Sequence, residues 1–233
     1  MTWLDQFASE AGAEIPEAVR ETLWGRGVSD EQIAAFRIGY VDHELPQILL
    51  PENFVRWAGD KISECLVFPI TNSIGEIRGL QFRHVERSRP GYMDYLPDQE
   101  EAVGFGLAHA MSPVWGCEEI IIVEGAFDLL PVQRFVPHVV ATLTARVTET
   151  YVRLLRRLVR RVWIWYDNDS TGDRAYQKFR QHYGVDFDIQ RLRCPKVSFG
   201  GKLVKDPGEL WEAWGDAQFG QYLRSAVGTH KLE

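Results

Sequence analysis

The hydrophobic pattern changes about halfway along the chain. From residue 115 onward, short uninterrupted runs of apolar and often β-branched residues alternate with longer amphipathic stretches. Three such runs lie at 120–123, 138–141 and 162–166. Together with the alternating segment Phe-Asp-Ile-Gln-Arg-Leu at 187–192, they predict four strands with helices between them. Strands that are apolar at every position indicate a parallel sheet that helices cover on both faces.

The first half of the chain has a more mixed pattern. Ser-Asp-Glu-Gln at 29–32 is a capping box, and it predicts a helix that we expect to stop at Gly39. Residues 66–70 and 77–84 read as two strands around a turn. The prolines within 86–114 predict irregular structure there.

This change of pattern suggests how the chain is divided. Its 233 residues are enough for one to two domains at roughly 100–200 residues each. We expect a smaller mixed α+β subdomain over 1–114, an α/β domain over 115–215, and a C-terminal helix or tail over 216–233.

Composition and cysteine spacing exclude several classes of protein. Hydrophobic residues make up 45% and charged residues 25%, as in globular proteins. Cys65, Cys117 and Cys194 are too far apart for a zinc half-site or a disulfide framework, so we expect no zinc and a cytoplasmic location. With no apolar run of about 18 residues and no signal-like start, we expect no membrane association.

The net charge of −7 narrows the possible modes of binding. It argues against a protein that binds nucleic acid over its whole surface, yet it leaves room for a local basic patch. It also fits a site that is crowded with carboxylates.

Acidic residues stand where the predicted parallel strands end, which is where such sheets carry their sites. Glu124 directly follows the first run, Asp167 and Asp169 follow the third, and Asp206 comes about fifteen residues after the last. Residues two apart in extended backbone project to the same side, so Asp167 and Asp169 can face one point. Adjacent carboxylates repel unless a cation lies between them, which favours Mg²⁺ or Mn²⁺. Taken singly, each acid is better explained as a loop or cap residue.

Four motifs occur in a recognisable order. They are Val-Glu-Gly-Ala-Phe-Asp at 123–128, Ala-Thr-Leu-Thr at 141–144, Trp-Tyr-Asp-Asn-Asp-Ser-Thr-Gly at 165–172 and Lys-Asp-Pro at 205–207. Together they resemble the Toprim motifs of bacterial DnaG-type primases and phage primase–helicases. Residues 26–40 and 67–83 are similar to the opening and the hairpin of the primase polymerase core. The resemblance, over about 20–215, implies a Toprim domain, a Rossmann-like parallel sheet flanked by helices, after a smaller mixed subdomain.

The same resemblance implies a DNA-directed RNA polymerase, a nucleotidyltransferase that makes RNA primers on single-stranded DNA from ribonucleoside triphosphates. Asp167, Asp169 and Asp206 would be ligands of two Mg²⁺ or Mn²⁺ ions, and Glu124 a ligand or an acid/base residue. Asp128 lies one helical turn beyond Glu124 and could join them. Catalysis would rest on Glu124, Asp167 and Asp169, and Lys205 would contact nucleotide phosphate.

Two groups of arginines are candidates for contacts with nucleic acid. Arg78, Arg83, Arg87 and Arg89 lie on and after the predicted hairpin, which faces the catalytic acids in the related primases. We therefore assign all four to DNA binding and Arg83 also to the nucleotide, although a solvated strand face explains them equally well. The arginines of 153–161 have a helical period, and we interpret them as the solvated face of a helix that covers the sheet, with phosphate contact as the second reading.

The chain departs from the family pattern at two positions. Gly208 stands where DnaG-type enzymes carry a second acid, a role that Glu209 could take, and Asp94 stands where a basic residue is usual. No zinc ribbon and no Walker A motif are present, so we expect a separate helicase or zinc-binding subunit and favour a phage-like origin. Two alternatives stay open, a Toprim-type metal-dependent nuclease and a non-catalytic Toprim module that binds DNA or a replisome partner.

Overall fold

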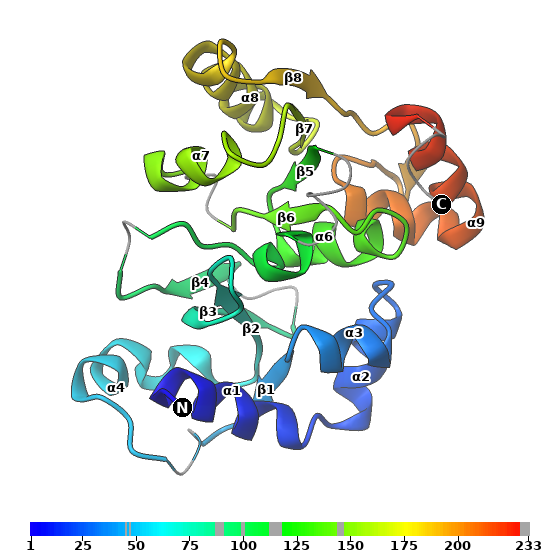
Figure 1. The fold of residues 1–233 in the computed structure, drawn as a ribbon. Helices are drawn as coiled ribbons and strands as arrows, with labels where there is room; N and C mark the ends of the chain where they lie inside the picture. Colours follow the sequence, from blue (N-terminus) through cyan, green and yellow to red (C-terminus); the bar gives the residue numbers. More distant parts are fainter. Residues whose placement is uncertain are drawn as a thin grey trace.

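The chain folds around two four-stranded sheets, one antiparallel and one parallel (Figure 1). The computed structural model describes residues 1–44, 46, 48–86, 91–98, 101–111, 118–143 and 147–228. In Figure 1 the antiparallel sheet and the helices of the first half lie in the lower part, and the parallel sheet with its helices lies above.

The antiparallel sheet has the strand order β1-β2-β3-β4. Its strands are β1 (Gly39–Val41), β2 (Cys65–Thr71), β3 (Ile77–His84) and β4 (Tyr92–Tyr95). The helical elements of this half are α1 (Trp3–Ala13), α2 (Glu17–Trp24), α3 (Asp30–Ala35), α4 (Glu52–Ala58) and the 3₁₀ turn η1 (Gly59–Ile62). Phe7 of α1, Phe54 of α4 and Phe82 of β3 are fully buried together, so this sheet has a core of its own.

The parallel sheet has the strand order β6-β5-β7-β8. Its strands are β5 (Glu119–Val123), β6 (Val139–Ala141), β7 (Arg161–Trp165) and β8 (Asp188–Arg191). Its helices are α6 (Ala126–Gln133), α7 (Glu149–Leu155), α8 (Ser170–Tyr183) and α9 (Pro207–Val227), and β9 (Ser198–Phe199) and β10 (Lys202–Leu203) form a small hairpin before α9.

Both faces of the parallel sheet are buried, as its uninterrupted apolar strands predict. Ile121 and Val123 point into a core shared with α6 and α9, whereas Ile120 and Ile122 point into a second core shared with α7 and α8. The fold class predicted from the sequence is confirmed: helices flank a parallel sheet, and a smaller mixed subdomain precedes it. The division at 114/115 and 215/216 stays a prediction.

Several local predictions are confirmed, and three are wrong. β3 spans 77–84 as predicted, and Ser29 caps α3 through the expected box with Gln32. Gly39 does not stop that helix: α3 ends at Ala35, and Gly39 begins β1. The stretch expected to be irregular contains β4, which the distant β3 holds in place.

The arginine-rich stretch is the third of these corrections. The helix ends at Leu155, and Arg161 already belongs to β7. Two of its arginines each contact two carboxylates: Arg156 pairs with Glu149 and Asp186, and Arg161 with Glu119 and Asp188. Acidic residues of this chain therefore occupy both of these guanidinium groups.

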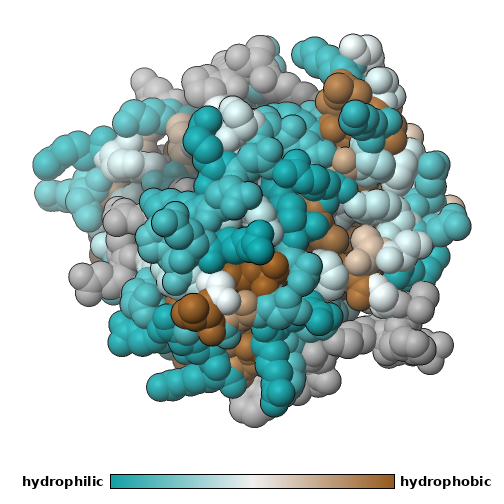
Figure 2. All heavy atoms as spheres, turned by 90° about the horizontal axis from the view of Figure 1, so that it is seen from above, coloured by the Kyte–Doolittle hydropathy of each residue, from teal (hydrophilic) through white to brown (hydrophobic). Residues whose placement is uncertain are grey.

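One face of the molecule is largely polar. Figure 2 shows a face on which hydrophilic residues dominate and hydrophobic residues gather only in small separate patches. Among the described residues, no helix is long and apolar enough to cross a membrane.

Candidate functional site

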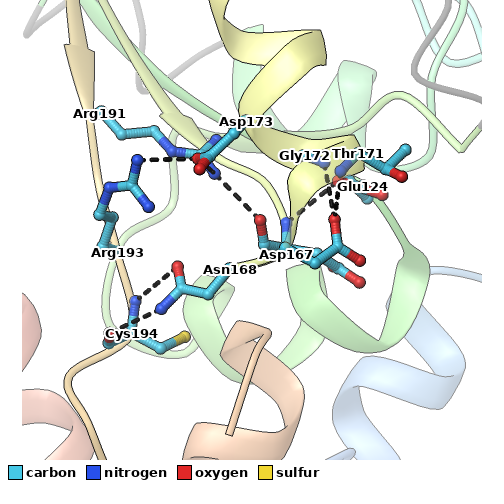
Figure 3. A network of polar contacts seen from close by, with 10 residues as sticks. Glu124, Asp167, Asn168, Thr171, Gly172, Asp173, Arg191, Arg193 and Cys194 are labelled. Atoms are coloured by element: carbon cyan, nitrogen blue, oxygen red, sulfur yellow. Dashed lines mark hydrogen bonds and ion pairs between the residues drawn. The ribbon is translucent and has the colours of Figure 1, made fainter.

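Two of the predicted acids meet at the C-terminal edge of the parallel sheet. β5 and β7 are neighbours with Val123 opposite Trp165, so the residues after both strands emerge side by side. The backbone N–H of Asp167 donates to Oε1 of Glu124 at 3.1 Å (Figure 3). Acids 43 residues apart in sequence are thus joined directly.

The loop after β7 is held in place by its middle residue, Asn168. The amide group of its side chain donates to the carbonyl oxygen of Cys194 at 2.7 Å and accepts from the backbone N–H of Cys194 at 3.3 Å. Its own backbone N–H donates to the carbonyl oxygen of Lys205 at 2.7 Å. Asn168 therefore fixes the segment that leads to Asp206 against the loop that carries Asp167.

Two helix N-termini bring two more of the predicted acids, Asp128 and Asp206, to the same edge of the sheet. Asp128, in the first turn of α6, accepts from the backbone N–H of Gly125 at 2.9 Å and of Gly208 at 3.4 Å. Asp206 is the N-cap of α9 and accepts from the N–H of Glu209 at 2.7 Å. Helix N-termini stabilise negative charge, so both helices help to keep carboxylates at this edge.

These side chains line one cavity of about 400 Å³, which we name the acidic pocket. Six of the predicted site residues line it: Arg83, Glu124, Asp128, Asp167, Lys205 and Asp206. The other lining residues are Arg26, Tyr92, Gly125, Phe127, Leu143 and Glu209. One pocket therefore brings the acids from the strand and helix ends against basic side chains.

The charges of the pocket disfavour one another. Burial, and then the nearby Asp206 carboxylate, raise the pKa of Asp128 well above its usual value. Burial raises the pKa of Asp206 to about 6, with Glu209 and Asp167 adding to the rise. Burial also raises the pKa values of Glu124 and Asp167. A bound cation would offset this repulsion and favour the ionised form of the carboxylates.

The donor set fits a hard divalent cation. All the acids offer carboxylate oxygens, the ligands that Mg²⁺ and Mn²⁺ prefer. The ammonium of Lys205 already lies 3.2 Å from Oδ2 of Asp167 and supplies positive charge there. Among the described residues, no three acidic, histidine or cysteine side chains are gathered closely enough to chelate an ion together. Mg²⁺ commonly uses only one or two protein carboxylates and completes its coordination with water and phosphate oxygens.

Asp169 behaves differently from the other predicted ligands. It is the N-cap of α8, and its Oδ1 accepts from the N–H groups of Thr171 and Gly172 at 2.8 and 2.9 Å. These bonds lower its pKa, against the opposite shift at Asp167. Asp169 is not among the residues that line the acidic pocket, although its charge acts on Glu124. One of its oxygens is thus engaged in capping.

Sequence reasoning missed Arg26 as a pocket residue. The Cζ of Arg26 lies 3.7 Å from the centroid of the Phe127 ring, and its guanidinium forms an ion pair with Glu212 at 3.3 Å. The Cζ of Arg83 lies 5.0 Å from the same ring and 4.5 Å from that of Tyr92. Ring and ion-pair contacts thus hold two guanidinium groups opposite the acids.

The other predicted arginines lie elsewhere. Arg78 forms ion pairs with Glu76 and Glu101, and it does not line the acidic pocket. Arg87 and Arg89 lie outside the described residues. A role of these three in DNA binding stays a prediction.

Known proteins resemble this chain in sequence. A family model described as Toprim-like matches residues 121–209. The DNA primase of Deinococcus radiodurans is 29% identical over 253 aligned positions, which cover 98% of this chain and 42% of that protein. The chain thus spans about two fifths of this relative's length.

Solved structures agree on the fold. The zinc-binding and RNA polymerase domains of the Aquifex aeolicus primase align with a TM-score of 0.72 at 23% identity, over 95% of this chain and 59% of that one. A DnaG primase catalytic domain bound to single-stranded DNA aligns with a TM-score of 0.72 at 22% identity, over 95% and 77% of the two chains. The chain contains a Toprim domain and has the fold of a DnaG-type primase core.

The packing of α9 on α6 in this chain leaves no room for a side chain at position 208, where a second acid was expected. A Cβ atom on Gly208 would lie 2.7 Å from the carbonyl oxygen of Phe127 in α6. Pro131, four residues beyond Phe127, has no N–H to bond that carbonyl, which leaves it open to the close approach of α9. Position 208 is therefore closed to any side chain in this arrangement of the two helices.

The second departure, Asp94, lies outside the acidic pocket of this primase-like core. It accepts from Nε2 of Gln81 at 2.8 Å and lines a separate cavity of about 450 Å³ with Tyr95 and Trp57. Burial raises the pKa of Asp94. Its carboxylate is thus directed to the antiparallel sheet and not to the acids.

Proposed function

We propose that this chain is the catalytic core of a DNA primase, which makes short RNA primers on single-stranded DNA by metal-dependent nucleotidyl transfer. The observation that carries the proposal is the acidic pocket, in which carboxylates from β5, β7, α6 and α9 face two arginines. The Toprim-like match and the DNA primase relative support the same reaction.

In this proposal the acids hold Mg²⁺ or Mn²⁺, with Glu124, Asp128, Asp167, Asp169 and Asp206 as the ligands. Bound ions would neutralise the triphosphate and lower the pKa of the attacking 3′-hydroxyl. Glu124 lies beside Asp167 and is the acid placed to act on the reacting group as well.

The basic residues have the complementary role of holding the triphosphate. Arg26 and Arg83 offer planar guanidinium groups, which bind phosphate oxygens in pairs. Contacts to Phe127, Tyr92 and Glu212 restrict these side chains before a nucleotide arrives, so less rotamer entropy is lost on binding. Lys205 would exchange its contact with Asp167 for a phosphate once metal neutralises that carboxylate.

The substrates and partners follow from the same proposal. Ribonucleoside triphosphates and a single-stranded DNA template would be the substrates, and a separate helicase or zinc-binding chain would act with the core in the cytoplasm. The related catalytic domain bound to single-stranded DNA supports the template, and the Aquifex aeolicus primase combines a zinc-binding domain with an RNA polymerase domain.

The test is primer synthesis on single-stranded DNA with four ribonucleotides, one of them labelled, and Mg²⁺ or Mn²⁺. We expect labelled oligoribonucleotides from the wild type and at least about a 100-fold loss in Asp167→Asn. Asp188→Asn is the matched control, because Asp188 pairs with Arg161 at the far edge of the sheet and should leave synthesis intact. Shortened template would instead indicate a nuclease, and DNA binding without either product would indicate a binding module.

A further inference from the structure

A small hairpin stands at the rim of the acidic pocket. The N–H of Val204 donates to the carbonyl oxygen of Val197 at 2.9 Å and closes the base of the hairpin. The next residue, Lys205, contacts Asp167 through its side chain. β9 and β10 therefore project from the point where the chain enters the proposed catalytic site.

The turn of the hairpin fixes which side chains share a face. Gly200 and Gly201 have φ values of 57° and 78°, as the two central residues of a type I′ turn require. This turn sets Phe199 opposite Lys202 and Ser198 opposite Leu203. Because cross-strand partners point to the same side, Phe199 and Lys202 occupy one face and Leu203 the other.

The hairpin is exposed although it carries large apolar side chains. Phe199 is 46% exposed and Leu203 is 66% exposed. They lie on opposite faces, so they form no continuous apolar patch of the kind that docks a protein partner. A single aromatic ring beside a lysine is instead the arrangement that binds one stacked base and its phosphate.

Local charge favours an anionic partner as well. Residues 189–205 contain five basic residues and no acidic residue, in a chain whose net charge is −7. Three of the six lysines of the chain fall at positions 196, 202 and 205. Among the described residues, Arg191, Arg193 and Lys205 have carboxylate partners, whereas no ion pair involves Lys196 or Lys202. Positive charge is thus available at the hairpin itself.

We propose that this hairpin binds the single-stranded DNA template next to the acidic pocket, with Phe199 stacking on a base and Lys202 contacting a phosphate. The inference rests on the proposed primase function and adds a template contact outside the acidic pocket. The phenyl ring offers a face to any base, so the contact tolerates every template sequence. Lys202 precedes Lys205 of the acidic pocket by three residues, which span at most roughly 10 Å of extended chain, so the contacted nucleotide lies close to the proposed reaction centre.

The test measures binding of fluorescently labelled single-stranded DNA by anisotropy over a range of salt concentrations. Phe199→Ala and Phe199→Leu should each weaken binding about tenfold, with the salt dependence unchanged, because stacking is lost and charge is kept. Lys202→Ala should make the negative slope of log binding constant against log salt concentration shallower by about 0.7, the value for one phosphate contact on a single strand. Phe199→Tyr should keep binding, since it keeps the ring.

Leu203→Ala is the matched control on the opposite face of the same hairpin, and it should bind DNA within about twofold of the wild type. Equal losses in Leu203→Ala and Phe199→Ala, or wild-type binding by Phe199→Leu, would overturn the stacking contact. If the hairpin variants bind normally while primer synthesis still depends on Asp167, only this inference fails. If the wild type makes no primers, while both Phe199→Ala and Phe199→Leu weaken DNA binding and Leu203→Ala does not, the proposed function fails and the hairpin contact stands.

Discussion

Replacing Gly208 with alanine tests how closely α9 approaches α6 at the acidic pocket. The new Cβ would lie 2.7 Å from the carbonyl oxygen of Phe127, and 3.4 Å from carboxylate oxygens of both Asp128 and Asp206. The Phe127 oxygen belongs to helix backbone and not to a flexible side chain. Relief of the overlap therefore requires a shift of one helix N-terminus against the other.

The expected loss follows from two opposing effects. Inserting a methyl group into a close-packed contact costs about 1–3 kcal/mol. Alanine regains up to about 1 kcal/mol over glycine through its helix propensity. The middle of both ranges gives a net destabilisation of about 1.5 kcal/mol, which for a chain of this size lowers Tm by about 3–6 °C.

Thermal unfolding in EDTA, followed by circular dichroism, measures this difference. Gly12→Ala is the control, because Gly12 also lies in a helix, α1, and its Cβ would meet only the carbonyl oxygen of Ile38 at 3.8 Å. We expect Gly12→Ala to melt at or above the wild-type temperature. If Gly208→Ala did the same, position 208 would be open and the reasoning on the missing acid would be wrong.

Three further predictions concern the charges of the protein. Asp206→Asn keeps the N-cap and removes a carboxylate whose pKa is raised to about 6. In EDTA, this variant should have an unfolding free energy higher by on the order of 1–2 kcal/mol above pH 6 and nearly unchanged at pH 4, as measured by denaturant titration. The sign follows from the two pKa values of Asp206. Its carboxyl has a higher pKa in the folded protein than in the unfolded chain, so its cost in stability is absent below the unfolded value of about 4 and complete above the folded value of about 6. Mg²⁺ should raise Tm more at pH 7.5 than at pH 5, since its ligands must lose protons first; equal shifts in calorimetry would contradict this. Arg156→Ala should leave both the melting temperature and DNA binding nearly unchanged in thermal unfolding and anisotropy measurements, because its partners Glu149 and Asp186 form surface ion pairs that water screens.

The sequence predicted best what local chemistry decides. The two-stranded segment around residues 72–75 and the capping box at Ser29 depend on near neighbours, and both were predicted correctly. The acids after β5 and β7 could be placed together because parallel strands end at one edge of a sheet. Periodicity and turn residues carry this information within a short window.

Features that depend on distant partners were missed or wrong. β4 exists because Tyr95 pairs with Leu80, which no local pattern in its own segment reveals. Arg161 continues a helical period in sequence, yet it pairs with Glu119 and Asp188 in neighbouring strands. Arg26 reaches the acidic pocket only through packing on Phe127, about one hundred residues away. Tertiary contacts decided each of these cases against the local signal.

The acidic pocket keeps its charges close by surrounding them with backbone N–H donors. The N–H groups of Gly125, Gly208 and Glu209 bond the carboxylates of Asp128 and Asp206, and that of Asp167 bonds Glu124. The N–H groups of Gly125, Gly208 and Glu209 lie at the N-termini of α6 and α9, and the close contact of these two helices requires glycine at position 208. Yet burial still raises the pKa values of these acids, so the donors compensate their charges only in part. A divalent cation would therefore stabilise the ionised form of these carboxylates further. The absence of a side chain at position 208 is what lets α6 and α9 approach closely enough for Asp128 and Asp206 to lie near one another.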